Sequence, residues 1–292
     1  MQSIQKLGIW AEGARPKTIP AAIVPVLVGT SSVETNFNLL RFLLALLVSV
    51  ALQIGVNYAN DYSDGIRGTD QDRLGPRRLV GSELVEPSKV KLAAVISFLV
   101  AAIAGLILSV ITSPWLIAIG LVAILAAWFY TGGTKPYGYS GYGEISVFVF
   151  FGLVATVGSA FVQIEKIEIS SIVCSIPVGL LASALLVVNN FRDIETDSKT
   201  GKRTLAVRLG KSKTQMLYAF MLLGAAGTCI LVAFLYTLLV LIVLAALPLS
   251  LKLISDVYTK TTSPDLIKIL ENTAKLHMLS GLLLAIGLIA GL

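Results

Sequence analysis

Charge, cysteine and histidine are all scarce in this sequence. Charged residues account for only 14% of its 292 residues, whereas about a quarter of the residues are charged in a typical soluble domain. The two cysteines, Cys174 and Cys229, lie in apolar segments without the spacing of metal ligands, and His277 is the single histidine. These scarcities argue against a histidine-based catalytic triad or metal site, and we expect both cysteines to be buried apolar side chains.

Long apolar runs take the place of the missing charge. Hydrophobic residues make up 55% of the chain and the mean hydropathy is +0.84, so the expected solvent is a lipid bilayer. Each run must be helical there, because unpaired backbone groups find no water. The runs lie at 17–33, 38–57, 90–111, 114–131, 145–163, 170–190, 214–234, 236–254 and 273–291. We therefore predict an all-α polytopic membrane protein, a bundle of nine transmembrane helices in a single domain over residues 1–292.

The basic residues are sorted between the two sides of this predicted bundle. The short connections on one side hold only Arg41 and Lys166, whereas the other lysines and arginines lie in the N-terminal segment and in the longer connections 58–89, 132–144, 191–213 and 255–272. By the positive-inside rule, the N-terminus and the long connections face the cytoplasm of a multi-pass protein of the cell membrane. The net charge of +6 therefore reflects topology, and nucleic acid is not an expected partner.

Two matched groups of polar residues end the second and the sixth runs. The first group contains Gln53, Asn57, Asp61 and Asp64, at spacings of four, four and three. The second group contains Asn189, Asp193 and Asp197, at a spacing of four. On a helix each group shares one face, and both helices leave the membrane on the same side. We therefore expect the two groups to meet at one cavity that faces the cytoplasm.

Paired carboxylates at this spacing predict a metal site. Two carboxylates three or four residues apart on a helix repel each other unless a cation lies between them. Oxygen ligands suit Mg²⁺, which takes one or two carboxylates and completes its shell with water and substrate phosphates. The predicted ligands and catalytic residues are Asp61, Asp64, Asp193 and Asp197, with Asp70 ranked below them. Such ions would neutralise a diphosphate, so that its bond to an allylic carbon can break.

The loops after the two groups offer further candidate ligands for a diphosphate. The basic residues there are Arg67, Arg73, Arg77, Arg78, Lys135, Lys199, Lys202 and Arg203. Arginine forks match phosphate oxygens and lysine acts as a mobile point charge, although each of these residues singly can also be a topology signal. Tyr130, in the segment 130–144, is either part of an interfacial aromatic belt or a face for a planar acceptor or a carbocation.

Four stretches carry a resemblance to a known family: ARPKTIPAAIVPVLVGT (14–30), NYANDYSDGIRGTDQDRLGPRRLVGS (57–82), YTGGTKPYGYSGYGE (130–144) and NNFRDIETDSKTGKRTLAVRLG (189–210). The chain resembles the UbiA-type intramembrane prenyltransferases over almost its whole length, and is most similar to the members that act in menaquinone biosynthesis. The resemblance implies nine helices, with Asp-rich motifs after the second and the sixth. It also implies that Asn57 and Asn189 belong to these motifs. Substrate-binding roles are implied for Arg67, Lys135, Lys202 and Arg203.

The family's chemistry supplies the expected reaction. The resemblance implies Mg²⁺ as cofactor, and polyprenyl diphosphate and 1,4-dihydroxy-2-naphthoate as substrates. The prenyl group would replace the carboxylate of the naphthoate, with loss of CO2 and diphosphate, to give demethylmenaquinone. A polyprenyl tail would lie in an apolar tunnel for which Gly152, Gly158, Ser159 and Ala160 are candidate wall residues, although small residues serve helix packing equally well.

Three alternatives stay open on the sequence. The first keeps the family and changes the acceptor to 4-hydroxybenzoate, haem or homogentisate. The second is a secondary transporter, although the acidic residues gather at one interface rather than at the midplane. The third is a CDP-alcohol phosphotransferase, which the residues after Asp64-Gly65 do not match. For the prenyltransferase we expect Asp61→Asn and Asp193→Asn each to remove most activity.

Overall fold

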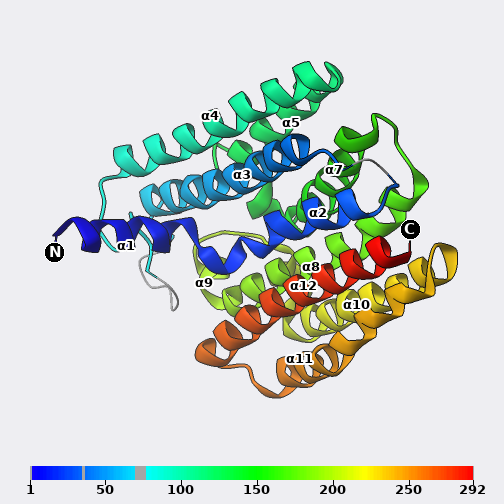
Figure 1. Ribbon diagram of the computed structural model, residues 1–292. Helices are drawn as coiled ribbons and strands as arrows, with labels where there is room; N and C mark the ends of the chain where they lie inside the picture. Colours follow the sequence, from blue (N-terminus) through cyan, green and yellow to red (C-terminus); the bar gives the residue numbers. More distant parts are fainter. Residues whose placement is uncertain (1, 35–36, 70–76, 292) are drawn as a thin grey trace.

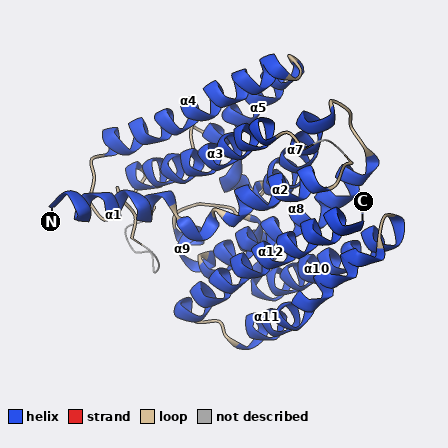
Figure 2. Cartoon of the chain, viewed as in Figure 1, coloured by secondary structure: helices blue, strands red, loops and turns tan. Residues whose placement is uncertain are grey.

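The computed structural model describes residues 2–34, 37–69 and 77–291, and this part of the chain consists of helices joined by loops and turns, without strands (Figure 2). Seven of the described helices are long and apolar enough to cross a membrane. They are Leu39–Ile66 (α3), Pro87–Ile111 (α4), Gly143–Ile164, Ile169–Arg192 (α8), Leu205–Leu235 (α10), Leu238–Thr259 and Ser263–Gly291 (α12). Two shorter apolar helices, Pro20–Ser31 (α2) and Trp115–Phe129 (α5), lie where the first and fourth runs were predicted.

Two of the long helices are composite. Gly143–Ile164 consists of α6 (Gly143–Val147), a π-helical segment η3 (Phe148–Val154) and α7 (Ala155–Ile164). Leu238–Thr259 joins a 3-10 segment η4 (Leu238–Ala246) to α11 (Leu247–Thr259). The remaining elements are α1 (Gln2–Ala14), η1 (Pro16–Thr18), η2 (Tyr137–Ser140) and α9 (Ile194–Lys199). A π-helical segment such as η3 is a departure from the α-helix that is frequent at functional sites.

The helices form three groups in space. In Figure 1, α3, α4 and α5 lie on one side, α10, α11 and α12 lie on the other, and α2, α7 and α8 run between them. Helix α3 packs on α4, α8 packs on α10 and α12, and α2 contacts both α12 and α7. A large part of the apolar core lies among α8, α10, α11 and α12, around Val188, Leu222 and Leu253. The cavity described below lies on the other side of α8, towards α3 and α5.

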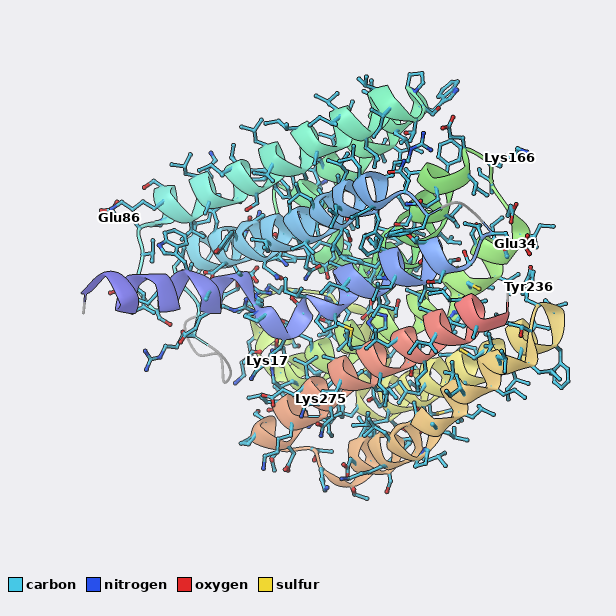
Figure 3. All side chains as sticks on the ribbon, in the orientation of Figure 1. Lys17, Glu34, Glu86, Lys166, Tyr236 and Lys275 are labelled. Carbon is cyan, nitrogen blue, oxygen red and sulfur yellow. The ribbon has the colours of Figure 1, made fainter. Side chains whose placement is uncertain are left out.

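The two ends of the bundle differ in what they carry. Lys17, Glu86 and Lys275 lie towards one end, whereas Lys166 and Tyr236 lie at the opposite end (Figure 3). Helix α1 and helix α9 lie at the first end (Figure 1), so the segment after the sixth predicted run is on the side where the N-terminus lies. This arrangement places the motif-bearing segments together at one end of the bundle.

Arg41 ties three helices together at the end opposite the motifs. Its guanidinium donates to the carbonyl oxygens of Val162 at 3.0 Å and Ile111 at 2.9 Å, and pairs with Glu165 at 2.7 Å. The last carbonyls of α4 and α7 have no partner within their own helices, so this one side chain satisfies both ends. The basic residue that was predicted on the short-loop side therefore has a structural role.

Arg41→Ala is expected to destabilise the protein without changing its activity at permissive temperature. Hydrogen bonds that involve a charged group contribute about 1.5–3 kcal/mol each, and we expect the apparent melting temperature in detergent to fall by about 5 °C. Lys166→Ala is the matched control, because Lys166 is an exposed cation at the same end. Equal melting temperatures for the two variants would show that Arg41 only marks topology.

Candidate active site

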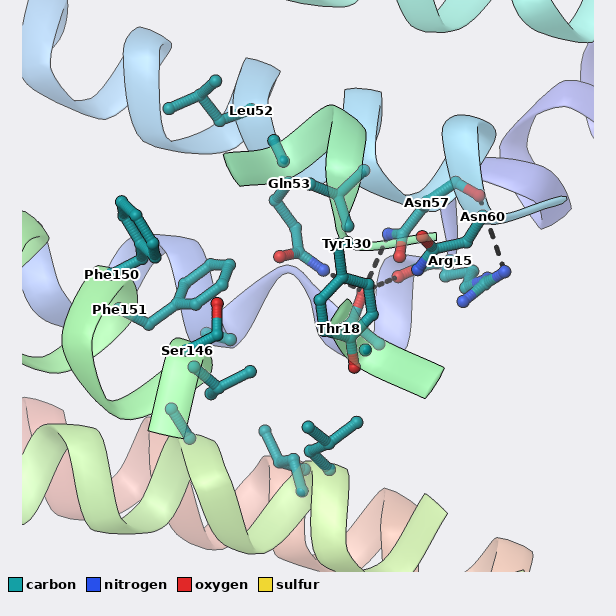
Figure 4. Close-up of a pocket in the computed structure, with 18 of the residues that line it drawn as sticks. Arg15, Thr18, Leu52, Gln53, Asn57, Asn60, Tyr130, Ser146, Phe150 and Phe151 are labelled. Carbon is teal, nitrogen blue, oxygen red and sulfur yellow. Dashed lines mark hydrogen bonds between the residues drawn. The ribbon is translucent and has the colours of Figure 1, made fainter. Parts of the chain in front are cut away.

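A cavity of about 900 Å³ opens between the first and the second half of the bundle. Its polar end is lined by Arg15, Thr18, Asn57, Asn60, Asp64, Arg77, Arg78, Asn189, Asn190, Arg192, Asp193, Asp197 and Lys202. Its apolar part is lined by residues of α3, α4, α5, η3 and α7, among them Leu52, Leu108, Ile119, Phe150 and Val162. Figure 4 shows Gln53 and Asn57 of α3 across the cavity from Ser146, Phe150 and Phe151. The shape suits a molecule with a charged head and a long apolar tail.

Lys202 joins the two Asp-containing segments at the polar end. Its ammonium nitrogen lies 3.1 Å from Oδ1 of Asp64 and 4.0 Å from Oδ1 of Asp197. The same nitrogen lies 4.6 Å from the centre of the Tyr139 ring, where a cation is attracted by the ring face. Carboxylates from the segments that follow the second and the sixth predicted runs therefore share one cation in this structure.

Tyr139 is the second link between these segments. Its hydroxyl donates a hydrogen bond to Oδ1 of Asp64, and its backbone carbonyl accepts one from Arg203 at 2.8 Å. Burial raises the pKa of Tyr139 well above its usual range, and the neighbouring carboxylate of Asp64 adds to the effect. The tyrosine is therefore a neutral donor at any physiological pH.

Asp193 is held by the residue before it in the chain. Arg192 donates to both carboxylate oxygens of Asp193, from Nε at 2.7 Å and from Nη2 at 2.8 Å, and Nη2 also donates to Oδ1 of Asn189 at 2.9 Å. Both charged side chains are buried. A fork that contacts both oxygens fixes the carboxylate more firmly than a single bond, so the geometry of the second group is preorganised.

Asp61 does not line the cavity, and the expectation that it shares a face there with Asp64 is wrong. The carboxylate of Asp61 is fully buried, and its two oxygens accept hydrogen bonds from the backbone N–H groups of Leu79 at 2.9 Å and Val80 at 3.1 Å. Asn60 lines the cavity instead, and its Oδ1 accepts a hydrogen bond of 2.7 Å from Thr131. Asn60 and Asp64 are four residues apart, as are Asn189 and Asp193, but Asn57 and Asp61 have the same spacing, so the repeat alone does not single out Asn60.

The predicted phosphate ligands divide into two sets. Arg77 lines the cavity with Lys202, whereas Lys135 and Arg203 are exposed away from it. Arg67 also lies outside the cavity lining, where its guanidinium donates to the carbonyl oxygens of Thr131 and Gly133. Arg73 and Asp70 fall outside the described residues.

The N-terminal segment forms a wall of the site that sequence reasoning missed. The hydroxyl of Thr18 accepts hydrogen bonds from Gln53 at 2.9 Å and from Asn57 at 3.0 Å, and Asn57 also donates to the carbonyl of Ala14 at 2.9 Å (Figure 4). Arg15 lines the cavity from a backbone with φ of 53°, which is unusual for a residue with a side chain. The amide of Asn57 therefore holds this wall in place.

The tunnel wall only partly matches the small residues named from the sequence. Gly158 and Ser159 line the cavity, and a Cβ added to Gly158 would meet no atom within 4 Å. Gly152 and Ala160 are absent from the lining, and a Cβ on Gly152 would lie 2.7 Å from the Cα of Gly179. Gly152 therefore serves close packing of η3 on α8, whereas Gly158 leaves space in the tunnel. Tyr130 lines the cavity, which favours the second of the two roles considered for it.

The residues at the polar end fit a divalent metal only if a substrate helps to bind it. Among the described residues, no group of three or more acidic, histidine or cysteine side chains is placed to hold an ion. The side chains there that could act as metal ligands are nevertheless the carboxylates of Asp64, Asp193 and Asp197, together with neighbouring carboxamides. Mg²⁺ commonly takes one or two protein carboxylates and otherwise water and phosphate oxygens, and this set of donors meets that requirement.

Fold and cavity together define a class of protein: a polytopic helical membrane protein with a site for a charged head group and an apolar tail. The chain belongs to the UbiA prenyltransferase family, whose model matches residues 22–279. It is similar to the 1,4-dihydroxy-2-naphthoate octaprenyltransferase of Mycobacterium tuberculosis, with 48% identity over 90% of this chain and 91% of that protein. The enzyme of the same name from Escherichia coli is 36% identical, over 98% of this chain and 97% of that protein.

A solved structure supports the fold. A UbiA homolog from Archaeoglobus fulgidus, bound to GPP and Mg²⁺, superposes with a TM-score of 0.72 and covers 97% of this chain and 99% of the other. Its sequence is only 15% identical, so the likeness concerns the arrangement of the helices. The prediction of an all-helical membrane bundle of the UbiA type is confirmed at this level.

Proposed function

We propose that this protein transfers a polyprenyl group from polyprenyl diphosphate to 1,4-dihydroxy-2-naphthoate, with loss of CO2 and diphosphate, to give demethylmenaquinol, the reduced form of demethylmenaquinone. The observation that carries the proposal is the cavity, in which a polar end with carboxylates and basic residues continues into an apolar tunnel. The relatives that share 36% and 48% of their residues with this chain bear the name of this activity. A charged head and a long tail are the two parts of the donor substrate.

In this proposal Asp64, Asp193 and Asp197 would hold Mg²⁺, which would supply positive charge to neutralise a bound diphosphate. Lys202 and Arg77, with Arg78 beside it in the cavity lining, contact the phosphate oxygens. Lys202 already lies between Asp64 and Asp197, so a short movement of its flexible side chain exchanges a carboxylate partner for a phosphate. These residues bind and orient the leaving group.

The rest of the cavity orients the acceptor and excludes water. The faces of Tyr130, Phe150 and Phe151 line the junction between the polar end and the tunnel, where they stabilise positive charge on the allylic carbon. The ring carbon that bears the carboxylate forms the new bond to that carbon, and the carboxylate leaves as CO2. Because CO2 rather than a proton leaves the ring, no strong base is needed at that atom.

The proposal includes an orientation in the cell membrane. With α2 and α5 counted as crossings, the bundle has nine transmembrane helices, and the polar end of the cavity faces the cytoplasm. Support comes from the sorting of basic residues between the loops and from the position of Lys17 and Lys275 towards the end opposite Lys166 (Figure 3).

Product analysis with several acceptors tests the proposed function. Membranes that contain the protein are given a polyprenyl diphosphate, Mg²⁺ and either 1,4-dihydroxy-2-naphthoate, 4-hydroxybenzoate or homogentisate. We expect a prenylated product, identified by mass spectrometry, from the naphthoate alone. A product from another acceptor would replace the acceptor in the proposal, whereas no product from any acceptor would contradict prenyl transfer itself.

A further inference from the structure

Glu144 is a buried acid beside the cavity that the proposed chemistry does not use. It lies in the first turn of α6 and is 4% exposed. Its Oε1 accepts a hydrogen bond of 2.9 Å from Nδ2 of Asn190, whereas Oε2 has no hydrogen-bond partner among the residues that the structure describes. A carboxyl group is costly to bury inside a membrane protein and commonly marks a functional site. The contact with Asn190 therefore calls for an explanation.

This hydrogen bond determines which way the carboxamide of Asn190 points. The Glu144 oxygen that accepts the bond must face the NH2 group of the amide, and the carbonyl oxygen then points the other way. Asn190 lines the cavity, whereas Glu144, its hydrogen-bond partner, is not among the lining residues. Glu144 thus turns the carbonyl oxygen of Asn190, a hydrogen-bond acceptor, towards the cavity.

Asn190 lies at the junction between the polar end and the tunnel. On α8, Asp193 follows it by three residues towards the polar end, and Leu186 precedes it by four residues on the apolar side; both line the cavity. The reacting carbon of a polyprenyl diphosphate lies between the diphosphate and the tail, and so belongs at this junction. The ring that attacks this carbon must come to the same place.

We propose that Glu144 is a positioning residue, which holds Asn190 so that its carbonyl oxygen accepts a hydrogen bond from a hydroxy group of the aromatic acceptor. The inference rests on the proposed function and deepens it. A ring hydroxy group that donates a hydrogen bond releases electron density into the ring, and this makes the ring a better nucleophile. Glu144 itself touches neither substrate.

Glu144→Gln tests the orientation with almost no change of shape. The introduced amide carries an NH2 group as well as an oxygen, so it permits the carboxamide of Asn190 to turn around. We expect kcat/KM for the acceptor to fall about tenfold, the effect of one hydrogen bond, while the KM for polyprenyl diphosphate stays within about twofold. The matched control is Glu86→Gln, since Glu86 is an exposed acid on a loop at the end of the bundle where the motifs lie.

Two further measurements separate positioning from a general structural role. In an Asn190→Ala background, Glu144→Gln should add no further loss, because Glu144 acts only through Asn190. An acceptor whose hydroxy group is methylated cannot donate a hydrogen bond to Asn190. The ratio of kcat/KM for the free hydroxy acceptor to kcat/KM for the methylated acceptor should therefore be about tenfold higher in the wild type than in Glu144→Gln. The inference would be overturned if the losses of kcat/KM in the two single variants multiplied in the double variant. It would also be overturned if Glu144→Gln had the same ratio of kcat/KM between the two acceptors as the wild type.

Failure of the role proposed for Glu144 can be distinguished from failure of the proposed function. If the wild type prenylates no aromatic acceptor, the proposed function fails. If the wild type is active and Glu144→Gln has wild-type kcat/KM for the acceptor, only the role of Glu144 fails. Should Glu144→Gln not elute as a folded protein from size exclusion, Asn190→Ala decides alone: a wild-type kcat/KM for the acceptor would overturn the inference.

Discussion

Asp64→Asn is expected to lower the rate of prenyl transfer by about 10²–10³-fold, the range for the loss of one preorganised electrostatic group at a reacting centre. Asp64 is 6% exposed, lines the cavity and lies 3.1 Å from the ammonium of Lys202. Asparagine keeps the shape of the side chain but removes the negative charge, which attracts the ammonium of Lys202 and would help to hold Mg²⁺. Initial rates across a Mg²⁺ titration measure the effect, and we expect the variant to need more Mg²⁺.

Asp61→Asn is the matched control for this prediction. An asparagine at this position has one oxygen to accept from the backbone N–H groups of Leu79 and Val80, which now bond to two oxygens. One buried N–H then lacks its partner, at a cost of about 1–3 kcal/mol in stability. We therefore expect a lower melting temperature with an unchanged Mg²⁺ requirement. A raised Mg²⁺ requirement for Asp61→Asn, with none for Asp64→Asn, would reverse our assignment of the two aspartates.

Gly158→Leu is expected to shorten the prenyl chain that the enzyme accepts. Gly158 lies in α7, twelve residues after Ser146, and both residues line the cavity, so the glycine lies about three helical turns deeper along the composite helix. A leucine side chain there enters open space in the tunnel. We expect kcat/KM for octaprenyl diphosphate to fall by at least about 100-fold, and that for geranyl diphosphate to change little, because two isoprene units end before this depth.

Gly227→Leu provides the control for steric and stability effects. Gly227 lies on the exposed face of α10, away from the cavity, and a Cβ added there also meets no atom within 4 Å. This variant should treat long and short donors as the wild type does. Equal losses with geranyl and octaprenyl diphosphate in Gly158→Leu would show that the tail does not follow this tunnel.

Much of the architecture could be predicted from the sequence, because hydropathy alone dictates where a chain crosses a bilayer. All seven long helices, together with α2 and α5, lie at predicted apolar runs. The structure also brings one aspartate of each predicted polar group together, because Lys202 lies 3.1 Å from Asp64 and 4.0 Å from Asp197. Hydropathy and the spacing of polar residues along a helix are properties of the local sequence, so they can be recognised without knowing how the helices pack.

Which residues line the site depends on contacts between distant parts of the chain, and no local sequence pattern predicts these contacts. On α3, Asn57 and Asp64 are joined by helical spacings of three and four residues through either Asn60 or Asp61, so spacing alone does not choose between Asn60 and Asp61. The choice follows from the return of the chain at Leu79 and Val80, whose N–H groups bond to Asp61. The wall formed by Thr18 likewise depends on packing of the N-terminal segment against α3.

Release of 14CO2 from carboxyl-labelled 1,4-dihydroxy-2-naphthoate tests the central claim most directly. The assay uses membranes with the full-length protein, polyprenyl diphosphate, and either Mg²⁺ or EDTA. We predict release that requires both the diphosphate and Mg²⁺, that is nearly abolished in Asp64→Asn and that persists in Asp61→Asn at permissive temperature. No release from folded wild-type protein supplied with both substrates and Mg²⁺ would contradict the account.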